Sequence, residues 1–242
     1  MRNICVSLQS ECKSNKFCHT AKIIFHFFYS NMKHFKNITT LIFDFGGVLI
    51  NLDINQCIFN FKQLGLENFE QYLNNFAQTG FFMQLEKGLI SADEFRKEIR
   101  KLSPNVLTDA QIDDAWSSFL LEIPVEKLNM LIELRKRFRV VLLSNTNIIH
   151  FPNSEKMLFT LHGTKMSNYF DRCYLSYEMK MAKPDIEIFE NILLTENVDA
   201  KECLFLDDGL KNTEVAQKLG IQTYLVHEHE DLSFLLKPET WE

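Results

Sequence analysis

The stretch Thr40 to Asp53, TLIFDFGGVLINLD, decides the fold of this chain. Its first apolar run ends abruptly at Asp44, and Gly46 and Gly47 then turn the chain before a second apolar run begins. Short, dense apolarity is typical of a strand that is buried on both faces, as strands are in a parallel sheet. A carboxylate followed by glycines at the carboxyl end of such a strand lies where open α/β sheets bind their ligands. We therefore take Asp44 as the centre of the chemistry.

Composition limits the class of protein. The 242 residues are enough for one large α/β domain, or for a domain that carries an inserted subdomain. The formal net charge of −6 argues against a nucleic-acid partner, because no basic stripe is available to neutralise phosphates. No apolar run is long enough to cross a bilayer. We expect a small metabolite as the partner, neither nucleic acid nor a membrane, and a monomer or a homodimer.

The cysteines and the first residues bear on where the protein works. The six cysteines show no spacing of the Cys-x-x-Cys kind, and Cys173 and Cys203 lie in apolar contexts. This pattern favours buried thiols in a reducing cytosol, and so a cytoplasmic protein. Residues 1–31 are polar and lack sustained periodicity, whereas Met32 opens a run typical of an ordinary start before a first strand. We predict that 1–31 is a dispensable extension.

The segment after the first strand is helical. Ser91 with Glu94, and Thr108 with Gln111, each form a capping-box pattern ahead of an apolar-periodic stretch. No strand pattern interrupts this segment. We predict that residues 55–123 form an all-helical cap, inserted into a core domain that consists of residues 32–54 and 124–242.

Strand and helix alternate in the rest of the chain. The amphipathic segment 125–138 leads into a buried strand, and we expect Pro184 to begin a later helix in its first turn. Another helix is predicted from Asn212 to Leu219, where Gly220 ends it. The predicted strands are 140–143, 171–175, 203–206 and 221–226. This alternation predicts an α/β fold with a parallel sheet, right-handed crossovers and helices on both faces.

Polar residues follow the carboxyl ends of the predicted strands, and those ends share one edge of a parallel sheet. The residues are Asp44, Ser144 to Asn147, Lys183, and the pair Asp207 and Asp208. Carboxylates from separate strands crowd together only around a cation, and hard oxygen ligands beside a lysine indicate Mg²⁺ that holds a phosphate. Asp44 is then a candidate nucleophile that forms an aspartyl phosphate. Ser144 and Lys183 would neutralise charge on the phosphoryl oxygens.

Each of these residues has a plainer interpretation when it is taken alone. An Asp at the end of a strand is often a turn former, Ser144 and Asn145 can cap a helix, and Lys183 can be a solvated lysine before a proline. The acidic pair followed by Gly209 can be a simple turn. The order of acid, serine, lysine and acidic pair, each at a strand end, is much less expected by chance. It favours the functional interpretation.

These segments resemble the haloacid dehalogenase (HAD) superfamily, in the group whose helical cap follows the first motif. The matching stretches are IFDFGGVL (42–49), LLSNTN (142–147), MAKPD (181–185) and FLDDGLKN (205–212), and the resemblance covers about residues 39–230. LEKGLISADEF and SNTNIIH are also similar to bacterial α-D-glucose-1-phosphate phosphatases. The resemblance implies a Rossmann-like core with a cap and a Mg²⁺-dependent phosphatase. The implied substrate is a small phosphomonoester, with a sugar phosphate such as glucose 1-phosphate favoured.

The resemblance also implies roles for the matched residues. Asp44 is implied to be the nucleophile, and Asn212 to steady Lys183 and the shell around the metal. The residues implied at the metal are Asp44, Asp207, Asp208 and Gly46, the last through its backbone carbonyl. The residues implied at the phosphoryl group or the rest of the substrate are Ser144, Lys183, Asn145, Asn147, Gly47 and His150.

One position departs from the superfamily pattern. Most phosphatases of this superfamily carry a second Asp two residues after the nucleophile as general acid and base, and here that position is Gly46. Loss of a general acid–base group typically costs about 10²–10⁴-fold in rate. Asp53 is a candidate replacement, against the alternative that it caps the following helix. A second alternative is a non-catalytic or weakly active phosphosugar-binding or regulatory protein that has kept the pocket and lost turnover.

Overall fold

A parallel sheet of five strands lies at the centre of the computed structural model, which describes residues 34–76, 80–162 and 165–241. The strands are β1 (Thr40–Phe43), β2 (Arg139–Ser144), β3 (Arg172–Leu175), β4 (Cys203–Asp207) and β5 (Gln222–Leu225). Their order across the sheet is β3-β2-β1-β4-β5, and every neighbouring pair is parallel. The predicted strands are confirmed, with ends that differ by at most one residue. The predicted extension, 1–31, falls outside the described residues.

β1 occupies the middle of the sheet and is buried along its whole length. Ile42 lies opposite Val141 on one side and Phe205 on the other. Successive side chains of a strand point to opposite faces, so Leu41 and Phe43 enter one apolar core and Ile42 enters another. This two-sided burial explains why the strand reads as an unbroken apolar run.

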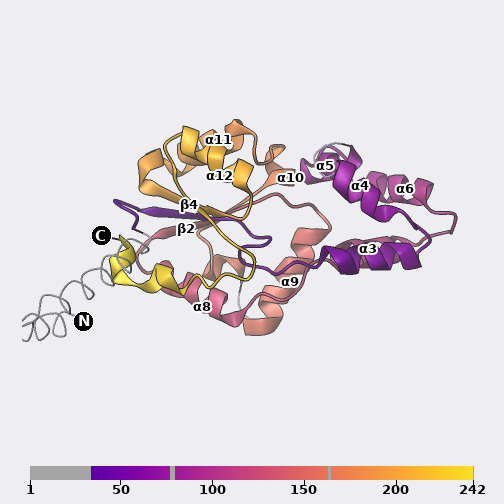
Figure 1. Ribbon diagram of the computed structural model, residues 1–242, viewed down its shortest axis with the longest axis horizontal. Coiled ribbons are helices and arrows are strands. Elements are labelled where there is room, and N and C mark those ends of the chain that lie inside the picture. Colours follow the sequence, from indigo (N-terminus) through magenta and orange to yellow (C-terminus); the bar gives the residue numbers. More distant parts are fainter. Residues whose placement is uncertain (1–33, 77–79, 163–164, 242) are drawn as a thin grey trace, which may run out of the picture.

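Helices cover both faces of the sheet, as Figure 1 shows. α11 (Ile186–Glu196) and α12 (Leu210–Lys218) lie on one face, and α8 (Val125–Leu134) and α9 (His150–His162) lie on the other. The expectation that Pro184 begins a helix is wrong by two residues. Pro184 lies instead in the preceding turn, where the Asp185 N–H donates to the Ala182 carbonyl. This turn contains Lys183, whose ammonium reaches the edge of the sheet.

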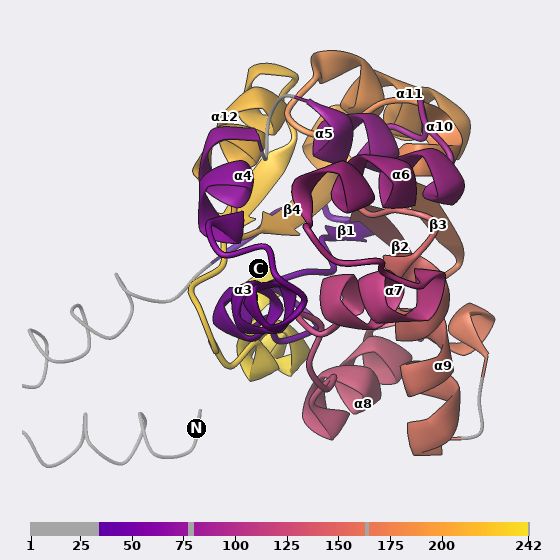
Figure 2. The same cartoon turned by 90° about the vertical axis from the view of Figure 1, so that its right-hand side faces the viewer.

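Five helices of the described part of the chain separate β1 from α8 and pack around a core of their own. They are α3 (Ile54–Gln63), α4 (Phe69–Phe76), α5 (Phe81–Glu86), α6 (Ala92–Leu102) and α7 (Asp109–Ser117). Aromatic rings dominate this core, among them Phe61 stacked on Phe69 with centroids 3.9 Å apart. Both predicted capping boxes are present, at Ser91 and at Thr108. Figure 2 shows these helices standing in front of the strands.

The two segments that join this helical insertion to the sheet run side by side. The Leu121 N–H donates to the Asn51 carbonyl at 2.9 Å, and the Asp53 N–H donates to the Phe119 carbonyl at 2.8 Å. Leu52 and Leu120 form an antiparallel bridge between these bonds. The remaining helical elements among the described residues are four short 3₁₀ segments and the four-residue helix α10 (Ser176–Met179). None of the helices in the described part of the chain is long and apolar enough to span a bilayer.

Candidate active site

Lys183 joins two carboxylates at the carboxyl ends of β1 and β4. Its Nζ lies 2.6 Å from Asp44 Oδ1 and 2.6 Å from Asp207 Oδ2, and it also donates to the Leu143 carbonyl at 3.2 Å. The three charged side chains are buried. A buried charge without partners costs several kcal/mol, so each member of this set depends on the others. The structure thus brings together the first strand end, the fourth strand end and the lysine that follows the third.

Asn145 fixes the backbone of Lys183. The Lys183 N–H donates to Asn145 Oδ1, and Asn145 Nδ2 donates to the Lys183 carbonyl, both at 2.8 Å. The neighbouring Thr146 is held by Ser176, whose hydroxyl accepts from the Thr146 N–H and donates to its carbonyl, both at 2.9 Å. The loop after β2 is therefore tied to the segment that leads from β3 to Lys183. The Asn145 amide, implied at the substrate, is engaged with the protein itself.

Asp207 uses both of its oxygens within the protein. Oδ2 accepts from Lys183, and Oδ1 accepts from the Gly209 N–H at 2.7 Å and from Asn212 Nδ2 at 2.8 Å. Asn212 therefore reaches Lys183 only through Asp207. A carboxylate that is held by several donors has little freedom to rotate, so this arrangement orients the Lys183 ammonium toward Asp44.

Asp208 lies against the turn that follows Asp44. Gly47 has a φ of 71°, which L side chains rarely adopt, and a Cβ placed on it would lie 2.1 Å from Asp208 Oδ2. Gly47 therefore serves both the turn and the position of the acid. Carboxylate oxygens of Asp44, Asp207 and Asp208 lie within 4.8 Å of one another.

The electrostatics of this cluster fit a divalent cation. Burial raises the pKa of Asp44, Lys183 acts against this shift, and the charges of Asp207 and Asp208 add to it. Burial and the charge of Asp207 also raise the pKa of Asp208. A hard cation relieves such repulsion, and oxygen atoms are the ligands that Mg²⁺ prefers. The Gly46 carbonyl, to which no group in the described part of the chain donates, adds a further oxygen to the set.

Ser144 ends β2 at the same edge of the sheet. It is buried, and the one contact of its hydroxyl with the described residues is a long one of 3.5 Å to the Asn145 carbonyl. A hydroxyl proton that is bound so weakly by the protein is available for an incoming acceptor such as a phosphoryl oxygen.

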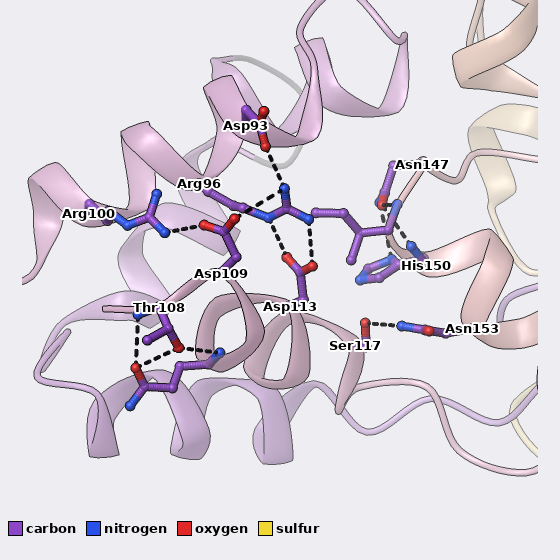
Figure 3. A network of polar contacts seen from close by, with 12 residues as sticks. Asp93, Arg96, Arg100, Thr108, Asp109, Asp113, Ser117, Asn147, His150 and Asn153 are labelled. Atoms are coloured by element: carbon purple, nitrogen blue, oxygen red, sulfur yellow. Dashed lines mark hydrogen bonds and ion pairs between the residues drawn. The ribbon is translucent and has the colours of Figure 1, made fainter. Parts of the chain in front are cut away.

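His150 and Asn147 lie in a buried junction between α7 and α9. His150 Nε2 lies 3.0 Å from the Trp116 carbonyl, so this nitrogen carries the proton, and Nδ1 accepts from Asn147 Nδ2 at 3.2 Å. Asn147 Oδ1 accepts from the backbone N–H of His150. Burial lowers the pKa of His150 to about 4, which keeps the ring neutral. Figure 3 shows this junction, in which Asn153 also donates to Ser117.

Asp53 caps a helix. Its Oδ1 accepts from the Gln56 N–H at 3.1 Å at the start of α3. This is the plainer of the two interpretations of Asp53, and within the described ranges no contact joins its carboxyl to Asp44 or Lys183.

Glu86, in the helical insertion, is an acid that the sequence did not single out. It is the last residue of α5 and is half-buried. Burial raises the pKa of its carboxyl to about 7, although the charge of Lys183 acts in the opposite direction. The charge of Lys183 therefore acts on an acid that belongs to the helical insertion. Its only sequence signal is its place in the quoted stretch LEKGLISADEF, which does not by itself indicate any chemistry.

Comparisons with known proteins show the family of this chain. The haloacid dehalogenase-like hydrolase family matches residues 38–220. D-ribitol-5-phosphate phosphatase from Bacteroides thetaiotaomicron is 37% identical over 187 residues, which are 77% of this chain and 91% of that protein.

Two solved structures are also similar to this chain. A wild-type HAD family enzyme of Bacteroides thetaiotaomicron, in complex with magnesium and inorganic phosphate, is 48% identical with a TM-score of 0.78, covering 83% of this chain and all of that one. A predicted HAD-like hydrolase of Porphyromonas gingivalis is 35% identical with a TM-score of 0.75, covering 81% of this chain and 94% of that one. The resemblance found in the motifs is thereby confirmed, and the chain belongs to the haloacid dehalogenase-like hydrolase family.

Proposed function

We propose that the protein is a Mg²⁺-dependent phosphatase that hydrolyses a small sugar or polyol phosphate. The observation that carries this proposal is the buried Lys183 between Asp44 and Asp207, with Asp208 within reach of the same point. Phosphoryl transfer is catalysed mainly by positioning and by charge neutralisation, and this cluster offers both. The similar enzyme crystallised with magnesium and phosphate supports the choice of ion and ligand.

The reaction runs through an aspartyl phosphate on Asp44. The Asp44 carboxylate attacks phosphorus, the ester P–O bond breaks, and its electron pair leaves with the alcohol oxygen. Water then attacks the phosphorus, which releases phosphate and restores the carboxylate. Lys183 and Ser144 stabilise the charge on the phosphoryl oxygens. Asp44, Asp208 and the Gly46 carbonyl would hold Mg²⁺, which would supply further charge neutralisation.

Helices α3 to α7 act as a cap over this site. We assign residues 55–123 to the cap and residues 32–54 and 124–242 to the core. Two paired linkers that contain Asn51 and Leu121 allow the cap to move as a unit, and closure excludes water from the reaction. The ion pair between Lys87 of the cap and Asp185 of the core, at 2.5 Å, supports a closed arrangement.

The substrate is a phosphorylated sugar or sugar alcohol. The relative named as a D-ribitol-5-phosphate phosphatase supports a primary phosphate ester of an acyclic polyol. Glucose 1-phosphate, favoured by the cap motif, is the second candidate. Ribitol carries its phosphate on a poor alkoxide leaving group, whereas glucose 1-phosphate has a better one at its anomeric oxygen.

Phosphate release tests this function. Purified full-length protein is incubated with Mg²⁺ and a panel that contains ribitol 5-phosphate and glucose 1-phosphate, next to Asp44→Asn and an EDTA-treated sample. We expect phosphate release by the wild-type chain alone. After an acid quench, the peptide that contains Asp44 carries one added phosphoryl group by mass spectrometry.

The non-catalytic alternative rests on Gly46, which has no side chain to protonate the leaving group. It predicts that a sugar phosphate binds tightly, as isothermal calorimetry measures, while no phosphate is released. That result overturns the phosphatase proposal.

A further inference from the structure

The proposed reaction lacks an obvious proton donor for its leaving group. At Gly46, a Cβ would lie 3.2 Å from Leu52 Cδ1, so this position faces an apolar side chain of the linker. The alkoxide that leaves from a sugar or polyol phosphate is a strong base, and its departure is slow unless it is protonated. Another residue must therefore provide the proton.

Most ionisable groups around the site are already engaged. Asp207 is held by three donors, and Lys183 is held by two carboxylates. Both ring nitrogens of His150 are hydrogen-bonded in a buried junction, and Asp53 caps α3. Glu86 differs from these residues, because no group in the described part of the chain donates to its carboxyl.

The two residues after Glu86 dock it onto the segment that carries Lys183. Lys87 pairs with Asp185, two residues beyond Lys183. Gly88 lies so close to α10 that a Cβ on it would be 2.1 Å from the Tyr177 carbonyl oxygen, and Lys180 donates to the Gly88 carbonyl. Figure 1 shows α5 beside α10 at the junction of cap and core. Glu86 is therefore held where the cap docks beside the segment that carries Lys183, near enough for the charge of Lys183 to act on its carboxyl.

We propose that Glu86 is the general acid and base of this enzyme, the catalytic residue that takes the place left open at Gly46. The inference rests on the proposed phosphatase function. If its carboxyl lies next to the phosphate dianion, Glu86 is stable there only when it is protonated, because a carboxylate would be repelled. The protonated carboxyl can donate a hydrogen bond to the ester oxygen.

The proton balance of the two steps is complete. As Asp44 attacks phosphorus and the ester P–O bond breaks, the Glu86 proton passes to the leaving oxygen, which gives a neutral alcohol and a Glu86 carboxylate. The carboxylate then takes a proton from water as the water oxygen attacks the aspartyl phosphate. Phosphate leaves, the Asp44 carboxylate is restored, and Glu86 is protonated again.

Leaving groups of different basicity test the proposal. The kcat/KM of Glu86→Gln is measured with the best polyol or sugar phosphate of the panel, with phenyl phosphate and with p-nitrophenyl phosphate. We expect a loss of about 10²–10⁴-fold for the polyol or sugar ester, and less than about tenfold for p-nitrophenyl phosphate, whose leaving group needs no proton. Phenyl phosphate falls between them. The control Glu98→Gln removes an exposed acid of α6 and leaves all three values unchanged.

The pattern of losses separates the proposal from its alternatives. An equal loss for all three esters means that Glu86 only supports the site, and a loss confined to the hydroxylated ester means that it binds hydroxyl groups. Either result overturns the proposal, as does an unchanged kcat/KM. A wild-type chain that hydrolyses none of the three esters instead overturns the phosphatase function itself. As a folding control, the thermal unfolding temperature of Glu86→Gln is measured, and we expect it to equal that of the wild-type chain.

Discussion

At the scale of single residues, the site depends on close approach between groups from different strands. The turn after β1 comes so near to the loop after β4 that only a glycine fits at position 47, beside Asp208. Because Gly47 has no Cβ, the turn after Asp44 can approach Asp208 this closely. This constraint leads to a prediction with a matched control.

Gly47→Ala removes activity, whereas Gly220→Ala leaves it intact. Both glycines have positive φ, 71° and 88°, so both substitutions carry a backbone penalty of about 1–2 kcal/mol. A Cβ at position 47 collides with Asp208 Oδ2, while one at position 220 meets its nearest atom, the Ala200 Cβ, at an ordinary 3.8 Å. Phosphate release and the Mg²⁺ concentration needed for half-maximal activity measure the difference. Equal activity of the two variants would contradict the role given to Gly47.

Asn145→Ala slows turnover through Lys183. The substitution removes two hydrogen bonds of 2.8 Å from the Lys183 backbone and leaves the ammonium with its carboxylate partners. Small displacements of a catalytic group cost up to about 10²-fold, so we expect kcat to fall by about one to two orders of magnitude. KM changes little if Asn145 acts by positioning, and a rise in KM alone would show that its amide binds substrate. Steady-state kinetics separates the two results.

The sequence predicts some of these residues and not others, for physical reasons. Asp44 and Asp207 were predicted because they lie at strand ends, and parallel topology alone brings such ends together. Lys183 was predicted from its place in the segment between the third strand and the helix that follows. His150 also follows a strand, as the first residue of α9, yet its ring turns into the junction with Trp116. That direction is decided by the packing of α7 on α9, which no local pattern contains. The sequence does not predict the position of Glu86 relative to Lys183, because that position depends on how α5 of the cap docks on the core.

At the scale of elements, local rules hold where contacts are local. The capping boxes at Ser91 and Thr108 involve residues three positions apart, so the sequence predicts them. The contact between α6 and α7 cannot be predicted in this way, because Arg96 and Asp113 lie on different helices that are joined by a loop. Figure 3 shows Arg96 between Asp93 and Asp113, with Asp109 beside Arg100. This network joins two helices that pack side by side in the cap.

Arg96→Met destabilises the protein by about 2 kcal/mol. Two of its nitrogens donate to the Asp113 carboxylate at 2.9 and 2.6 Å, and the Arg96 side chain is only 17% exposed. Charge-assisted bonds of this kind are worth about 1.5–3 kcal/mol, and the substitution leaves Asp113 without its partner. Urea unfolding measures the change. In a double-mutant cycle, Arg96→Met costs much less in an Asp113→Asn background, and full additivity would contradict direct coupling.

At the scale of the whole molecule, two bodies with separate apolar cores meet over the site. The sheet and its helices bury one set of residues, and the aromatic cluster of α3 to α7 buries another. The linkers, the buried junction between α7 and α9, and polar contacts such as the pair of Lys87 and Asp185 connect the two bodies. Of these contacts, the pair of Lys87 and Asp185 joins α5 of the cap to the segment that carries Lys183.

Lys87→Met weakens catalysis without weakening the fold. The Lys87 and Asp185 side chains are 27% and 44% exposed, and pairs with such exposure contribute about 0–1 kcal/mol to folding. The pair does join cap to core, so its loss favours the open form and moves Glu86 away from the leaving group. We expect an unfolding temperature close to that of the wild-type chain and a kcat/KM several-fold lower. Lys62→Met is the control, because Lys62 and Glu70 form a pair of similar exposure within the cap and its loss leaves kcat/KM unchanged. Equal kinetics for the two variants would show that closure does not depend on Lys87.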